Sequence, residues 1–150
     1  MRYIFTILIL FFLNSFVHAE DSLISIDEYM KDKGAESLEH NLYTLHRCTA
    51  LFMSVSNTLA LYEDDELTNA AKESYELAET LFQYSLAPYI DLKNVNQEDA
   101  QIQTKDIVVN LLGLYSNDMN YMLERNSEPF YGYILADIDF CNIMMQQLMP

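Results

Sequence analysis

The feature that most constrains the fold is a stripe of apolar residues between Leu45 and Tyr62. Its members follow one another at alternating steps of three and four residues, which places them on one side of a helix. They are Leu45, Cys48, Phe52, Val55, Leu59 and Tyr62. A helix with such a stripe packs against other helices, so this stretch predicts a long helix at the centre of a helical protein.

The two cysteines of the chain, Cys48 and Cys141, both lie on such stripes. The second stripe is near the C-terminus and comprises Ile134, Ile138, Cys141, Met145 and Leu148. An even pair of cysteines in an exported chain favours a disulfide over a metal or redox site, and no CxxC motif is present. We therefore predict a Cys48–Cys141 disulfide that joins the first long helix to the last.

The N-terminus predicts export. Arg2 is followed by an apolar run over residues 3–17, and Val17 and Ala19 supply the small residues that precede a cleavage site. Residues 1–19 are expected to be a signal peptide, which leaves residues 20–150 as a single domain in the periplasm or outside the cell. An uncleaved membrane anchor is the alternative, but the run is shorter than the roughly 20 apolar residues that a span needs.

The charge of the chain restricts its partners. The 150 residues carry a formal net charge of −15, and removal of the only charged residue of the signal peptide, Arg2, makes it −16. A polyanion repels nucleic acids and anionic membrane surfaces. We therefore expect no nucleic acid and no membrane association after cleavage, and a basic protein as the favoured partner.

Start and stop signals divide the mature chain into five helices. A capping box at residues 25–28 begins a short helix that should reach about Lys33 and stop at Gly34. Four long helices follow: 36–62, one after the acidic turn 63–66, one from the loop 94–97 to about 124, and 129–148. Pro88 should kink or end the second of them near Ala87. The sequence thus predicts an all-α, up-down-up-down four-helix bundle with a short N-terminal helix.

The apolar faces of the two middle helices are also predicted from spacing. In the second long helix the face comprises Leu67, Ala71, Tyr75, Ala78, Phe82, Ser85 and Tyr89. In the third it comprises Ile102, Val109, Leu112, Met119 and Leu123. Gly113 interrupts the third helix and is expected to let a neighbouring backbone approach closely.

No group of residues has the pattern of a catalytic or metal site. His40 and His46 are six positions apart and lack the Glu-x-x-His context of a bundle metal site. The acidic stretches 63–66 and 73–79 have neither a glycine turn nor alternating ligands, so solvated helix surfaces are expected. The chain has no nucleophile motif, and its methionines at helical spacing suit a core. We predict no catalytic residue, no metal and no cofactor.

Aromatic residues gather at the start of the last helix, where Phe130, Tyr131 and Tyr133 surround Gly132. Packed inward, they would close one end of the bundle. Exposed on an acidic protein, they would provide a surface for contact with a partner.

These features favour a soluble, exported and non-catalytic interaction factor, such as an inhibitor, an immunity-type protein or an accessory subunit, that binds a basic partner. The alternative is a carrier of a small ligand, with a cavity between the helices near Pro88 and Gly113. A carboxylate-dependent enzyme ranks lowest. An exposed aromatic patch would favour the first function, an apolar cavity with convergent polar groups the second, and buried neighbouring acids with a histidine the third.

Overall fold

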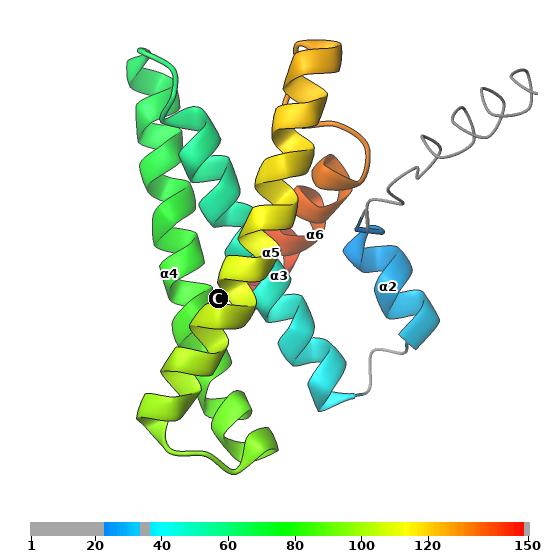
Figure 1. Ribbon diagram of the computed structural model, residues 1–150, viewed down its shortest axis with the longest axis vertical. Helices are drawn as coiled ribbons and strands as arrows, with labels where there is room; N and C mark the ends of the chain where they lie inside the picture. Colours follow the sequence, from blue (N-terminus) through cyan, green and yellow to red (C-terminus); the bar gives the residue numbers. More distant parts are fainter. Residues whose placement is uncertain (1–22, 34–36, 149–150) are drawn as a thin grey trace, which may run out of the picture.

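The computed structural model describes residues 23–33 and 37–148, and this part of the chain is all-α, with five helices and no strand. The helices are α2 (Ile26–Lys33), α3 (Leu38–Leu59), α4 (Asp65–Lys93), α5 (Gln97–Asn126) and α6 (Tyr133–Leu148) (Figure 1). The predicted signal peptide and the predicted cap Gly34 lie outside the described residues. Within the described ranges, no helix combines the length and hydrophobicity that a membrane span requires.

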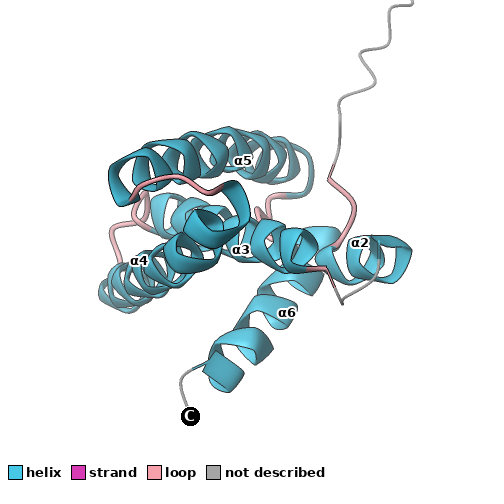
Figure 2. Ribbon diagram, turned by 90° about the horizontal axis from the view of Figure 1, so that it is seen from below, coloured by secondary structure: helices cyan, strands magenta, loops and turns pink. Residues whose placement is uncertain are grey.

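Helix α3 is the centre of the molecule, because it contacts each of the other four helices. The helices α3, α4 and α5 lie side by side, while α6 leaves this group at an angle and α2 lies beside α6 (Figures 1 and 2). Every residue from His46 to Phe52 is buried, so the middle of α3 is covered on all sides. Buried Thr49 is satisfied within the helix, since its Oγ1 donates to the Leu45 carbonyl at 2.8 Å, whereas buried Ser54 donates to the Leu112 carbonyl of α5.

Several of the predicted helix starts and stops are confirmed. Ser25 Oγ accepts from the Glu28 amide at 3.2 Å and begins α2. Asp64 caps α4 by accepting from the Leu67 amide at 2.9 Å. The two asparagines of the 94–97 loop have different roles. Asn94 ends α4 in the left-handed conformation, and the Asn96 side chain caps α5 by accepting from the Asp99 amide.

Two predicted boundaries are wrong. Of the two outcomes expected at Pro88, an end of the helix near Ala87 is wrong, because α4 continues through Pro88 to Lys93; the expected kink stays a prediction. Tyr89, beyond the proline, is buried against α3, and this tertiary packing outweighs the one backbone hydrogen bond that Pro88 removes. Helix α6 starts at Tyr133 rather than at Pro129, because Ser127 (φ 61°) and Gly132 (φ 59°) adopt left-handed conformations and hold residues 127–132 as a loop.

The predicted face of α5 is also wrong at its first two positions, since Ile102 and Val109 are about half exposed. Apolar residues occur on several sides of this helix, so spacing alone did not identify the buried side. The side that faces α3 consists of Ala100, Thr104, Val108, Leu111, Tyr115 and Met119. On α4, Tyr75 is likewise exposed, whereas Ala71, Ala78, Ser85 and Tyr89 are buried as predicted. Gly113 is exposed with nothing within 4 Å of a Cβ built there, so the expected close backbone approach is absent at this position.

Candidate binding site

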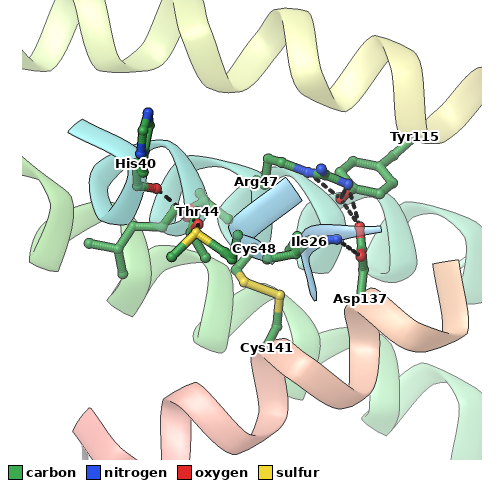
Figure 3. The surroundings of a disulfide bond; sticks show 11 residues. Ile26, His40, Thr44, Arg47, Cys48, Tyr115, Asp137 and Cys141 are labelled. Atoms are coloured by element: carbon green, nitrogen blue, oxygen red, sulfur yellow. Dashed lines mark hydrogen bonds and ion pairs between the residues drawn. A yellow bond between two sulfur atoms is a disulfide. The ribbon is translucent and has the colours of Figure 1, made fainter. Parts of the chain in front are cut away.

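The predicted disulfide is confirmed: Cys48 of α3 is bonded to Cys141 of α6, with the Cα atoms 5.6 Å apart (Figure 3). Both cysteines are fully buried, and 93 positions separate them in the sequence. The inward residues predicted for α6, namely Ile134, Ile138, Cys141, Met145 and Leu148, are buried or packed against the core. The bridge therefore ties the last helix to the central one through the middle of the core.

Next to the disulfide lies a buried polar network that joins four helices (Figure 3). Arg47 of α3 donates from Nη2 to Asp137 Oδ2 at 2.5 Å and to the Tyr115 hydroxyl at 2.9 Å. The Tyr115 hydroxyl in turn donates to Asp137 Oδ2. The other carboxylate oxygen, Oδ1, accepts from the Ile26 amide at 2.6 Å, so Asp137 of α6 caps the first turn of α2.

The electrostatics of this network follow from its burial, since Arg47 and Asp137 are 1% and 0% exposed. Burial raises the pKa of Asp137, although Arg47, Tyr115 and the Ile26 amide oppose this by bonding to the carboxylate. Burial also raises the pKa of the Tyr115 phenol, which keeps it a hydrogen-bond donor. The opposite charges of Arg47 and Asp137 compensate each other, and every acceptor oxygen of the carboxylate is used, which is the condition for keeping an ion pair in a core.

Sequence reasoning missed this network. Arg47 lies directly before Cys48, and Asp137 lies one helical turn before Cys141. Asp137 lies at helical spacing from Ile134 and Cys141, whereas Arg47 is not on the stripe of Cys48, and a residue next to a buried cysteine can be exposed, as Asn142 is. The sequence signal was therefore an acid on an apolar helix face, which requires a buried partner but does not identify Arg47.

A pocket of about 390 Å³ opens between α2, α3 and α6, beside the disulfide. Its lining residues are Met30, Asn41, Thr44, Leu45, Phe140, Ile143, Met144, Gln147 and Leu148. None of the nine is charged, and six are apolar. Neither Pro88 nor Gly113 lines this pocket, so it lies elsewhere than the cavity expected from the sequence.

Three polar side chains line the pocket. Thr44 is buried, and its hydroxyl lies 2.9 Å from the His40 carbonyl and 3.2 Å from Met30 Sδ, to either of which it can donate, while both lone pairs of its oxygen remain able to accept. Asn41 and Gln147 are exposed, and each carries an amide that both donates and accepts. The apolar floor with a few uncharged polar groups at its mouth is the composition of a small-molecule binding site.

The aromatic residues proposed to contact a partner are not equally placed. Tyr131 is 54% exposed. Phe130 and Tyr133 are half-buried and pack against the core, and the Tyr133 hydroxyl donates to Asp118. Burial, assisted by Asp118, raises the pKa of Tyr133. Of the three, only Tyr131 presents most of its ring to solvent, and the role of the set in partner contact stays a prediction.

The two histidines lie in different environments. His46 is 2% exposed, and its Nε2 has no hydrogen-bond partner. Burial lowers its pKa from 6.5 to about 4, so the ring is neutral at pH 7. His40 is half-exposed and contacts the Tyr29 ring edge-on. Within the described residues, no three His, Cys, Asp or Glu side chains are grouped so that they could hold a metal ion.

Comparison of the chain with protein-family models, curated proteins and solved structures gives no match. The pocket between α2, α3 and α6 is the feature of the described residues that best fits the binding of a small molecule.

Proposed function

We propose that the protein is an exported, non-catalytic binding protein that carries a small apolar molecule in the pocket between α2, α3 and α6. The observation that carries this proposal is the pocket itself, which has a volume of about 390 Å³ and is lined by six apolar and three uncharged polar side chains. Its volume lies at the lower end of the roughly 300–1,000 Å³ typical of ligand sites. The methionines Met30 and Met144 suit such a role, because flexible thioether side chains adapt to the shape of a ligand.

The proposal includes the architecture expected from the sequence, an up-down-up-down four-helix bundle. The short turns between α3, α4 and α5 and the disulfide between α3 and α6 support it. In this arrangement α6 is the fourth helix, although it leaves the other three at an angle (Figure 2), and it lines the pocket together with α2 and α3. Export is supported by the disulfide, since such bonds persist in oxidising compartments.

A titration with the neutral fluorescent probe N-phenyl-1-naphthylamine tests the proposal. We expect saturable binding of one probe per chain. The variant Ile143→Asp places a carboxylate in the pocket wall and should weaken binding by roughly tenfold, because the charge must be desolvated on probe entry. The matched control is Leu135→Asp, on the same helix, similarly exposed and outside the pocket lining. Unsaturable binding, or equal weakening by both variants, would refute the proposal.

A second candidate function is the interaction factor with a basic protein partner. It is favoured by the net charge of −15 and by the exposed ring of Tyr131. Charge gives fast but unselective association, so the contact needs an aromatic anchor, for which Phe130, Tyr131 and Tyr133 remain the candidates. Affinity capture from the compartment that holds the protein, comparing the native chain with Tyr131→Ala, tests it. A basic protein that is lost in the variant would support this function.

A further inference from the structure

The pocket lining specifies the charge of its ligand. All nine side chains are uncharged, and the polar atoms among them belong to two amides and one hydroxyl. An ionised ligand group buried here would lose its hydration and meet no opposite charge, which costs several kcal/mol even after relaxation. A neutral hydroxyl, amide or ester group would instead find both donors and acceptors in Asn41 and Gln147.

The position of these polar groups specifies the shape of the ligand. Asn41 and Gln147 are exposed, whereas Thr44 is buried and Leu45 and Met144 pack against the core. The polar groups therefore lie at two depths, the two amides at the solvent side and the Thr44 hydroxyl on the inner side, while the apolar Ile143 is itself 58% exposed. A molecule that fits this lining is mainly apolar and bears an uncharged group that can reach an amide or the Thr44 hydroxyl.

The net charge of the whole protein also disfavours anionic ligands. With an excess of 15 negative charges on the chain, an anionic molecule is repelled before it reaches the pocket. Long-range repulsion is screened by salt, whereas the absence of a countercharge in the pocket is not. The two effects can therefore be separated by experiment.

We propose that the pocket takes an uncharged amphiphile, namely an apolar chain or ring that bears a neutral hydrogen-bonding group, and that it rejects the corresponding carboxylate or sulfonate. This inference rests on the proposed carrier function and adds the chemical class of the ligand.

The test uses two pairs of molecules that differ only in charge. N-phenyl-1-naphthylamine and 8-anilino-1-naphthalenesulfonate share one ring skeleton, and only the second carries a sulfonate. 1-Decanol and decanoate share one chain length and serve as competitors for the bound neutral probe. At pH 8 we expect the neutral member of each pair to bind at least roughly tenfold more tightly, and the difference to persist in 1 M NaCl, where the screening length is about 3 Å.

The second part of the test is a variant that should gain affinity for anions. Gln147→Lys places a cation at the mouth of the pocket, and decanoate should then displace the neutral probe at least roughly fivefold better than from the native protein. Gln146→Lys is the matched control, since it adds the same charge at the next position, which is exposed but does not line this pocket. An improvement in Gln147→Lys alone supports the inference.

The possible outcomes separate the carrier function from the chemical class of the ligand. If the neutral probe does not bind, the carrier function fails. If it binds but the sulfonate and decanoate bind equally well, the carrier function stands and the inference on ligand class is overturned. Discrimination that disappears in 1 M NaCl, or equal gains in both lysine variants, would assign the effect to the overall charge and would also overturn it.

Discussion

The helices on the two sides of α3 are held in different ways. Helices α4 and α5 are 29 and 30 residues long, and buried apolar side chains hold them along much of their length. Helices α2 and α6 have only 8 and 16 residues, and a disulfide, a buried ion pair and a backbone cap fix them at a few points. Apolar stabilisation grows with buried area, whereas a covalent or ionic bond acts at one place whatever the helix length. The short helices therefore rely more on such bonds than the long helices do, although the polar network also reaches α5 through Tyr115.

The largest expected effect comes from removing the disulfide. Replacing both cysteines by alanine should lower the free energy of unfolding by up to about 4–5 kcal/mol, the value for a loop of this length in the chain-entropy model. The loss should be concentrated in α2 and α6, where hydrogen exchange should accelerate first. Denaturant titration and hydrogen exchange measure both quantities. If hydrogen exchange accelerated equally in α4 and α5, the helices on both sides of α3 would unfold together, and the proposed difference between the two sides would be wrong.

A slightly smaller effect is expected from the ion pair. Asp137→Leu leaves Arg47 buried without a countercharge and should cost about 3–5 kcal/mol. The double variant Arg47→Met with Asp137→Leu should cost less than the sum of the two single changes, because the pair is removed as a unit. Denaturant titration of all four proteins completes the cycle.

The exposed pair Lys72–Glu76 on α4 provides the control for that cycle. Its atoms are 3.8 Å apart in solvent, so Glu76→Gln should change stability by no more than about 1 kcal/mol. Additive losses in the buried cycle would contradict the reading of Arg47 and Asp137 as one unit.

The third expected effect is a dependence of stability on pH, and it concerns the side of α3 that packs against α4. There His46 lies near the Tyr89 ring, and its Nε2 has no hydrogen-bond partner. Its pKa is about 4 in the folded protein and 6.5 in a free chain, so the unfolded chain binds more protons between these values. Stability should therefore be highest above pH 6.5 and fall by about 3 kcal/mol as the pH drops to 4. His46→Gln should flatten this slope. An unchanged slope in the His46 variant would assign the acid sensitivity to other groups.

Most of the fold could be predicted from the sequence because its signals are local. Caps such as Asp64 and Asn96 act on amides three positions away, and the α3 and α6 stripes each have one clear apolar side. The face of α5 could not be predicted, because Ile102 and Val109 compete with Val108 and Leu111, and only contact with α3 decides between them. The end of the helix predicted near Pro88 was wrong for the same reason, since the burial of Tyr89 outweighs the tendency of proline to end a helix.

The candidate site was less accessible to sequence reasoning. The pocket depends on how α6 departs from α3, and no residue pattern encodes that angle. The ion pair brings together residues 90 positions apart, and the cap on Ile26 comes from a residue 111 positions away. Single-sequence reasoning does not identify contacts over such separations, and the disulfide was predicted because cysteines pair only with each other.

The separation of these partners has a consequence for biosynthesis. The thiol of Cys48 emerges 93 residues before that of Cys141, and Arg47 emerges 90 residues before Asp137. At translation rates of roughly 5–20 residues per second, the interval is roughly 5–20 s, which exceeds the time a helical hairpin needs to form. Helices α3, α4 and α5 can thus assemble while an arginine and a thiol still await their partners. The arrival of α6 then completes the core and, with it, the pocket.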